Sequence, residues 1–345
     1  MIPIQNIYYM LSYAFQVLNE QGYKNIATEQ FHNTGELMAA ILEKGIAIQL
    51  KRGLGKEYIP QTEALSSLRG KIDIAESIKT QSMLRKQLIC TYDEFSVNST
   101  MNRIIKSTVA LLLRSNISKQ RKKNLRKLMM YFGEVDFIDL YTVNWNVQYN
   151  RNNQTYRMLI SVCYLVVKGL LQTQSDGSTQ LMDFLDEQRM CRLYEKFILE
   201  YYRKEYKNQI TANASQIPWQ LDNEENTMLP VMQSDIMLQH DNRVLIIDAK
   251  YYEHSTQVQF DKHTLHSNNL YQIFTYVKNK EYELREKDHT VSGMLLYAKT
   301  DEEIYPNNVY QMSGNQITVR TLDLNLPFDE IAGQLNTIAK THFDL

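Results

Sequence analysis

The chain has 345 residues, a length that usually divides into two domains rather than filling one hydrophobic core. Hydrophobic residues make up 43% and charged residues 22%, which is a globular composition and excludes a chain that is disordered throughout. The formal net charge of -1 excludes a globally basic nucleic-acid-binding protein, so any surface for nucleic acid has to be local.

The cysteines and the hydropathy pattern indicate a cytoplasmic protein with no membrane partner. Cys90, Cys163 and Cys191 are odd in number and far apart, so we expect free thiols rather than disulfides or a zinc site. The first residues lack the basic and apolar regions of a signal peptide. The longest mostly apolar run, residues 158–167, is far shorter than the ~20 residues that span a bilayer, which predicts a buried helix.

The first half of the chain is predicted to be mainly helical, with short strands. Apolar residues recur at helical spacing between Ile7 and Leu18, which predicts one buried helical face. Asn33 followed by Glu36 resembles a capping box that opens a helix over residues 37–50. The further elements expected in this half are strands at 68–74 and 88–92 and helices at 101–114 and 119–132.

The last of these helices carries a run of basic residues. Such a run can bind phosphate groups and is the best local candidate for contact with DNA or RNA. More often, a basic run on a helix is simply a solvated surface. The residues concerned are Lys119, Arg121, Lys122, Lys123, Arg126 and Lys127.

Two polar segments interrupt the pattern in the middle of the chain. Residues 150–155 precede an apolar helix expected over 156–171, and residues 172–180 have the composition of a linker. We therefore place a domain boundary in the second segment, which gives an N-terminal domain of residues 1–175 and a C-terminal domain of residues 176–345.

In the C-terminal half, helices and strands alternate. The elements expected are a long amphipathic helix over 181–207, strands at 229–239 and 243–250, a helix over 265–280, strands near 291–298 and 316–322, and a helix over 328–343. This order is typical of an α/β domain. The predicted fold class is therefore α/β, with a mainly helical N-terminal domain in front.

Charged side chains end the second strand of this domain. The run from Val244 to Ile247 is continuously apolar, as expected of a strand buried on both faces, and Asp248-Ala249-Lys250 follows it. Because side chains alternate along a strand, Asp248 and Lys250 point to one face. The turn at residues 240–243 brings the two strands together, so Asp235 can lie beside Asp248. Two converging carboxylates repel each other and favour binding of a divalent cation.

These residues fit phosphodiester hydrolysis. Mg²⁺ held by Asp235 and Asp248 would polarise a phosphate and lower the pKa of a bound water. Lys250 would orient that water or neutralise the charge that develops on the phosphate. Hard oxygen ligands favour Mg²⁺ or Mn²⁺ over zinc. Asp-x-Lys alone is a weak signal, and the alternative is a salt-bridged strand end.

Three further residues are candidates for the same site. Glu195, in the long amphipathic helix, could complete the metal site, although a surface glutamate fits that position nearly as well. Gln272 and Tyr276 lie four residues apart and therefore on one helical face. They could support the site or contact the substrate backbone, and ordinary packing is an equal alternative for Tyr276.

Together, Asp235, Asp248-Ala249-Lys250 and the Gln272 to Tyr276 pair resemble the PD-(D/E)xK nuclease superfamily, in particular its RecB-like branch. Ser234 stands where the superfamily name has proline, a position that varies among its members. Segments along the whole chain resemble the McrC family, the nuclease subunits of McrBC modification-dependent restriction systems. These segments are residues 2–14, 69–74, 92–96, 102–106 and 269–276.

The McrC resemblance implies a restriction-endonuclease-like fold for the C-terminal domain and a Mg²⁺-dependent endonuclease of double-stranded DNA. Asp235, Asp248 and Lys250 match the family's nuclease residues directly, and Glu195 matches more loosely. The resemblance also implies that the N-terminal domain docks onto a hexameric, McrB-like AAA+ GTPase that reads 5-methylcytosine, and that this chain stimulates its GTP hydrolysis.

GTP would be used by that partner and not by this chain. Residues 51–56 hint at a phosphate-binding loop but lack its spacing and its Ser or Thr. Two alternatives to the methyl-directed nuclease remain open. The chain could be a non-catalytic activator of the GTPase ring, or a nuclease that the partner directs to an unmethylated sequence.

Overall fold

The computed structural model of the chain describes residues 2–15, 18, 23, 26, 29, 31–151, 153–175, 187–222, 228–252, 257–259, 262–299 and 305–345. The chain divides into two compact units. The sheet unit comprises Met1–Thr28 and Leu185–Leu345, and the helical unit comprises Glu29–Phe184. The linker expected at residues 172–180 lies mostly outside the described residues. At the start of the chain the division differs from the sequence prediction, because residues 1–28 belong to the unit that contains the C-terminal half.

Four helices form the core of the helical unit. They are α2 (Thr34–Arg52), α4 (Thr100–Arg114), α5 (Lys119–Met129) and α6 (Tyr156–Ser175). Asn33, Ser99 and Ser118 cap the first three, and each accepts a hydrogen bond from a backbone N–H of the first turn. Their apolar faces meet in a core that includes Leu37, Ile104 and Val162. The helices expected at 37–50, 101–114 and 156–171 are thus confirmed, and the apolar run at 158–167 is mostly buried.

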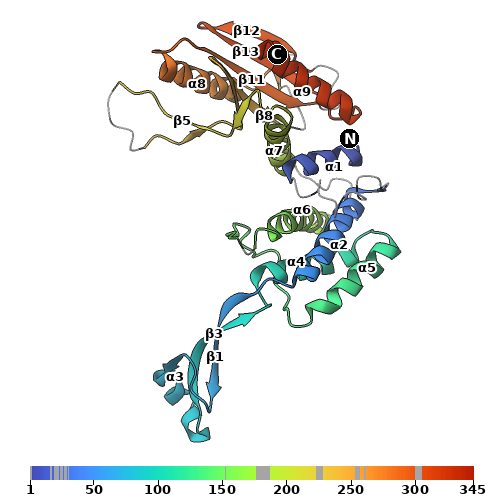
Figure 1. The fold of residues 1–345 in the computed structure, drawn as a ribbon, viewed down its shortest axis with the longest axis vertical. Coiled ribbons are helices and arrows are strands. Elements are labelled where there is room, and N and C mark those ends of the chain that lie inside the picture. Colours follow the sequence, from blue (N-terminus) through green and yellow to red (C-terminus); the bar gives the residue numbers. More distant parts are fainter. Residues whose placement is uncertain are drawn as a thin grey trace. The chain divides into compact units, whose positions relative to one another are not determined.

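A three-stranded antiparallel sheet extends from these helices (Figure 1), and we call it the arm (residues 57–96). Strands β1 (Glu57–Leu65) and β2 (Lys71–Asp73) both pair with β3 (Leu88–Ser96). The segment between β2 and β3 contains α3 (Ile74–Lys79) and the short 3-10 helix η3 (Ser82–Arg85). The sequence did not predict β1, because Pro60 within a polar run argues against a strand; an edge strand tolerates the proline.

The sheet unit contains a six-stranded mixed sheet in the order β12-β13-β11-β8-β7-β4. The central strands β8, β11 and β13 run parallel to one another. The outer strands β7, β4 and β12 run antiparallel to their neighbours. The strand bounds are β4 Thr211–Asn213, β7 Ile236–His240, β8 Arg243–Lys250, β11 Thr290–Ala298, β12 Asn308–Met312 and β13 Asn315–Leu322.

Helices cover both faces of this sheet. Helix α8 (Ser267–Leu284) packs Ile273 and Val277 against one face, in a cluster with Ile246 and Leu295. Helices α7 (Glu187–Glu205) and α9 (Phe328–Phe343) pack against each other through the Tyr202 hydroxyl, which donates to the Leu335 carbonyl. Leu296 points to the face opposite Leu295 and lies near α9. The predicted fold class, α/β behind a mainly helical domain, is confirmed.

Helix α1 (Ile4–Ala14) completes the sheet unit by packing on α7. The Asn6 side chain donates hydrogen bonds to the carbonyls of Leu324 and Leu326, at 2.7 and 2.8 Å. The Tyr9 ring stacks on the Phe328 ring with centroids 4.5 Å apart. Helical periodicity predicted that one face of this helix is buried but could not show which part of the chain buries it.

The strand expected over residues 229–239 is in fact divided. Strand β6 (Met232–Gln233) pairs with β5 (Gln216–Ile217) in a separate ribbon, whereas β7 joins the large sheet. The break falls at Ser234, whose hydroxyl donates to the Ser215 carbonyl at 3.2 Å. The division places Asp235 immediately before β7, next to the end of β8.

Four smaller findings complete the fold. Strands β9 (Gln257–Gln259) and β10 (Lys262–Thr264) pair antiparallel after β8, and the 3-10 helix η4 (Met130–Phe132) follows α5. The three cysteines are free thiols, as expected. Within the described ranges, no helix combines the length and the hydropathy that a membrane span needs.

Candidate active site

The register of β7 and β8 places Asp235 opposite Asp248. The two strands pair Ile236 with Ile247, and one further step along the ladder sets the two aspartates side by side on the same face. The Ala249 N–H donates a hydrogen bond of 3.0 Å to Asp235 Oδ2. The structure thus brings together the two carboxylates that the sequence places 13 positions apart.

Asp248 is almost fully buried, with 1% of its side chain exposed. Lys250 Nζ lies 2.7 Å from Asp248 Oδ2 as an ion pair, but neither oxygen of Asp248 has an aligned hydrogen-bond donor in the described part of the chain. Burial and then the charge of Asp235 raise the pKa of Asp248 to about 7, against the opposing effect of Lys250. Burial also raises the pKa of Asp235. Additional positive charge would therefore stabilise the ionised pair.

Lys250 is held from the other side by α8. Its Nζ donates to Gln272 Oε1 at 3.3 Å, and Gln272 Nε2 donates to the Tyr276 hydroxyl at 2.9 Å. Burial alone would lower the pKa of Lys250, but the nearby carboxylates outweigh it and raise that pKa above its ordinary value. The lysine is therefore a fixed cation between two carboxylates and an amide.

A second row of polar side chains, which the sequence did not predict, lies beside this one. Asn269 lies one helical turn before Gln272 and is 6% exposed. Its Nδ2 donates to the Tyr297 hydroxyl at 2.9 Å, and its Oδ1 accepts from the Tyr252 hydroxyl at 3.3 Å. Strand pairing sets Tyr297 beside Lys250. The available signal was the spacing of three, which puts a second amide on the helical face of Gln272.

Glu195 lies close to the carboxylate pair but does not join it. Burial, followed by the negative charge of Asp235, raises its pKa, so the two groups sense each other. Its Oε1 accepts a hydrogen bond of 3.0 Å from the Cys191 thiol. In the part of the chain that the structure describes, no three His, Cys, Asp or Glu side chains are grouped so that they could hold a metal ion. Asp235 and Asp248 are thus the two predicted ligands that lie opposite each other, and Glu195 as a third ligand stays a prediction.

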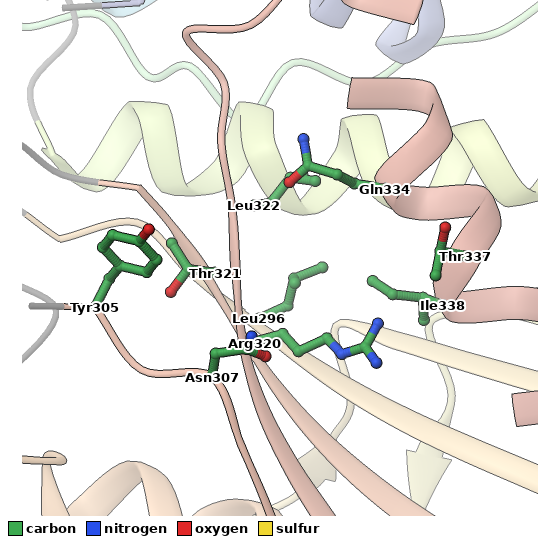
Figure 2. A pocket seen from close by; sticks show the side chains of 9 residues that line it. All are labelled: Leu296, Tyr305, Asn307, Arg320, Thr321, Leu322, Gln334, Thr337 and Ile338. Atoms are coloured by element: carbon green, nitrogen blue, oxygen red, sulfur yellow. The ribbon is translucent and has the colours of Figure 1, made fainter. Parts of the chain in front are cut away.

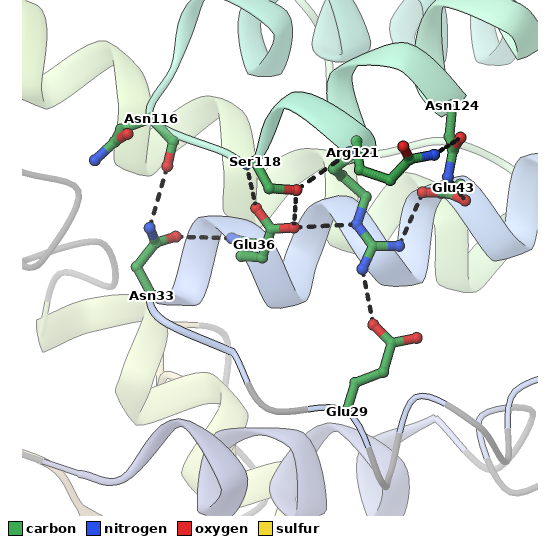
Figure 3. Close-up of polar contacts among 9 residues, drawn as sticks. Glu29, Asn33, Glu36, Glu43, Asn116, Ser118, Arg121 and Asn124 are labelled. Atoms are coloured by element: carbon green, nitrogen blue, oxygen red, sulfur yellow. Dashed lines mark hydrogen bonds and ion pairs between the residues drawn. The ribbon is translucent and has the colours of Figure 1, made fainter.

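The basic run of α5 separates into two sides. Arg121 faces α2 and forms ion pairs with Glu29, Glu36 and Glu43 at 2.8, 3.3 and 2.8 Å (Figure 3). Only 15% of its side chain is exposed. The prediction that Arg121 contacts nucleic acid is corrected accordingly, because its guanidinium is already occupied. The five other basic residues are exposed or half-buried.

Elsewhere in the sheet unit, a cavity of about 320 Å³ lies between α9 and the sheet face opposite α8 (Figure 2). Leu296, Leu322 and Ile338 line its apolar part, and Arg320 is the one charged side chain among the described residues that line it. None of the described residues that line the cavity carries a carboxylate. The cavity therefore lacks the anionic ligands that Asp235 and Asp248 offer to a cation.

Comparison with known proteins agrees with the sequence analysis. The family model of McrBC 5-methylcytosine restriction system components matches residues 5–298. The type IV methyl-directed restriction enzyme EcoKMcrBC of Escherichia coli K12 is 29% identical over 329 residues, which cover 94% of this chain and 93% of that protein.

Two solved structures from Thermococcus gammatolerans are also similar. One is a half-complex from a tetradecameric assembly of McrB AAA+ hexamers with bound McrC, with 18% identity and a TM-score of 0.49, covering 97% of this chain and 76% of that chain. The other is a McrBC complex with 22% identity and a TM-score of 0.42, covering 59% of this chain and 58% of that chain.

Proposed function

We propose that this chain, which belongs to the family of McrBC 5-methylcytosine restriction system components, is the DNA-cutting subunit of such a system. The observation that carries the proposal is the opposition of Asp235 and Asp248 at the end of a buried strand, with Lys250 2.7 Å from the latter. The relative in Escherichia coli is a methyl-directed restriction enzyme. We therefore take modified double-stranded DNA as the substrate.

The carboxylate pair fits a divalent cation such as Mg²⁺ or Mn²⁺. Two opposed carboxylates whose pKa values are raised by burial need positive charge, and Asp248 Oδ1 and Oδ2 are buried without an aligned donor among the described residues. Mg²⁺ is commonly bound through one or two carboxylates while it keeps several waters. Bound there, the ion would supply charge to the scissile phosphate and lower the pKa of a coordinated water.

The residues of the chain have distinct roles in this proposal. Asp235 and Asp248 would hold the ion, and the Ala249 N–H fixes the orientation of the Asp235 carboxylate. Lys250 would act as a cation that orients the attacking water or stabilises charge on the phosphate. Gln272 and Tyr276 hold Lys250 in place.

We propose further that the arm docks onto a McrB-like AAA+ GTPase. Large exposed apolar patches mark interaction surfaces, and the arm exposes several large apolar side chains. The rings of Tyr58 and Phe95 lie 4.9 Å apart on its surface, and Leu84 is 82% exposed. The other exposed apolar residues of the arm are Leu68, Ile74, Ile78 and Met83.

Two substitutions test the nuclease proposal. We expect Asp248→Asn and Lys250→Ala to lower cleavage of methylated plasmid by at least about a hundredfold in the complex with the cognate GTPase, because each removes a charge needed at the phosphate. Stimulation of GTP hydrolysis should persist. Asp288→Asn, which changes a carboxylate bonded to Asn242 before β11, is the matched control.

The same assay separates the alternatives. If wild-type complex cuts neither methylated nor unmethylated plasmid under any Mg²⁺ or Mn²⁺ concentration, the chain is a non-catalytic activator. If it cuts unmethylated plasmid equally well, the partner directs the nuclease to an unmodified sequence. Normal cleavage by both variants would refute the assigned site.

A further inference from the structure

The inner side of helix α5 is fixed to helix α2. Arg121 is bound by three carboxylates, and its neighbour one turn on, Leu125, is fully buried. The Ser118 N–H and hydroxyl donate to the Glu36 carboxylate at 2.8 and 2.9 Å (Figure 3). Glu36 thus anchors α5 instead of completing the capping box that the sequence predicted. Which side of α5 faces outward is therefore determined.

The outer side of α5 is a cluster of cations. Since an α-helix has 3.6 residues per turn, the remaining basic residues point away from the side that carries Arg121 and Leu125. The carboxylates that contact the helix from α2 are already paired with Arg121. No ion pair joins the outer cations to another described residue. This outer face consists of Lys119, Lys122, Lys123, Arg126 and Lys127.

Helix stability does not account for this arrangement. Lys119 with Lys123, Lys122 with Arg126, and Lys123 with Lys127 are like-charged neighbours four residues apart, each of which destabilises a helix. The first turn of α5 contains no acidic residue, although the helix dipole favours negative charge there. The sequence therefore maintains a cation cluster at a cost to the helix, which indicates a polyanionic ligand.

The dimensions of the face suit a nucleic-acid backbone. From residue 119 to residue 127 the helix rises about 12 Å, and one strand of B-DNA presents a phosphate about every 3.4 Å of its axis. Lysine is depleted from the cores of protein interfaces, and the five cations of the outer face precede the apolar Met129 and Met130 without an apolar side chain among them on that face. A phosphate backbone therefore fits this face better than a protein does.

We propose that the outer face of α5 binds the phosphate backbone of duplex DNA, so that the helical unit holds the substrate through a surface distinct from the carboxylates of the sheet unit. The choice of duplex DNA as the polyanion rests on the proposed nuclease function. The face contacts no bases, so it contributes affinity without sequence selectivity.

The experiment uses the full chain and a 30-base-pair duplex in EDTA, with fluorescence anisotropy at several salt concentrations. The variant Lys123→Gln/Arg126→Gln/Lys127→Gln removes three cations. We expect the slope of log affinity against log salt to fall by about 2.7, at about 0.9 per contact, and the affinity at 0.1 M salt to fall of the order of a hundredfold. Its melting temperature should be unchanged or higher, because like-charge repulsion is relieved.

The matched control is Lys51→Gln/Arg52→Gln/Lys56→Gln, which removes three exposed cations from the same unit. It should leave the salt slope unchanged. Equal losses in both variants would mean that net charge alone matters and would overturn the proposal. The proposal would also be overturned if the α5 variant bound DNA as tightly as the wild type does. That outcome includes the case in which the variant loses binding to the GTPase partner instead. Because the assay involves no cleavage, its result is independent of whether Asp248 proves to be essential for cutting.

Discussion

At the scale of single residues, the site balances its charges through close contacts: Lys250 lies 2.7 Å from Asp248 and donates a hydrogen bond to Gln272. Asp235, Asp248 and Lys250 are identified by local patterns, namely a hairpin and a charged end on an apolar strand. The contact of Asn269 with Tyr297 joins residues 28 positions apart and could not be predicted, whereas Cys191 and Glu195 lie four residues apart on α7, a spacing that predicts contact. The sequence predicted Glu195 as a candidate ligand. Whether its carboxylate reaches a metal ion or only lies near the site depends on tertiary packing, which the sequence pattern does not give.

The buried Asp248 carboxylate predicts a pH dependence of stability in metal-free protein. Its pKa is 3.8 ordinarily and about 7 in the folded chain, so the folded state binds a proton that the unfolded state releases. The contribution of Asp248 to the free energy of unfolding is therefore greatest below pH 4 and is lost as the pH rises towards 7. The loss amounts to a few kcal/mol, at about 1.4 kcal/mol per pKa unit.

The substitution Asp248→Asn should remove this dependence and make the metal-free protein more stable at pH 8. Denaturant unfolding in EDTA measures the free energy of unfolding of each chain at pH 5 and pH 8, with Asp288→Asn as the control. Added Mg²⁺ should stabilise the wild type at pH 8 and leave the free energy of unfolding of the substituted chain unchanged. A wild type that is equally stable at both pH values would contradict the raised pKa assigned to this carboxylate.

At the scale of secondary structure, periodicity predicted the long helices and the buried central strands. Their signals are strong because burial on a fixed face demands apolar residues at a fixed period. The edge strands β4 and β12 and the proline-containing β1 were missed, because edge strands are short or half-exposed and need no such pattern. The position of α1 was missed for a different reason, since its packing partners lie in the C-terminal half of the chain.

Asn6 offers a test of the placement of α1. It is 4% exposed and bonds two carbonyls of the loop before α9. We expect Asn6→Ala to destabilise the protein by about 1–3 kcal/mol, because the buried Leu324 carbonyl and the part-buried Leu326 carbonyl lose their donor. Hydrogen exchange should accelerate in residues 324–331 and not in α2 or α5.

The exposed Asn325, substituted by Ala, is the control for Asn6→Ala. Faster exchange confined to the helical unit would show that α1 belongs there instead. An unchanged exchange pattern throughout the chain would show that the two hydrogen bonds contribute little.

At the scale of the whole molecule, the two units divide the proposed activity. The sheet unit contains the carboxylates, whereas the helical unit contains the arm and the cationic face of α5. Composition and a polar linker predicted two domains, since 345 residues exceed one ordinary core. Which of the two would bind a partner was implied by family resemblance, and the exposed apolar side chains of the arm now give that assignment a physical reason.

The division predicts that partner binding and DNA binding can be lost separately. Leu84 is 82% exposed at the end of the arm, so Leu84→Asp should not disturb a core. A charge placed in an apolar interface should weaken binding of the GTPase by tenfold or more, at about 2 kcal/mol for a central contact. DNA cleavage by the mixture of this variant with the GTPase should fall as partner binding falls. The affinity of the variant for duplex DNA, measured by anisotropy in EDTA, should equal that of the wild type.

Lys79→Ala, on the same arm with a side chain 78% exposed, is the matched control, because it removes a polar contact and no apolar surface. Sedimentation with the GTPase separates complex formation from activity in both variants. If Leu84→Asp binds the partner normally and the Asp248→Asn complex still hydrolyses GTP, the ring must be recognised through a surface outside the arm. If Leu84→Asp loses the partner and DNA together, the two functions share one surface and the division fails.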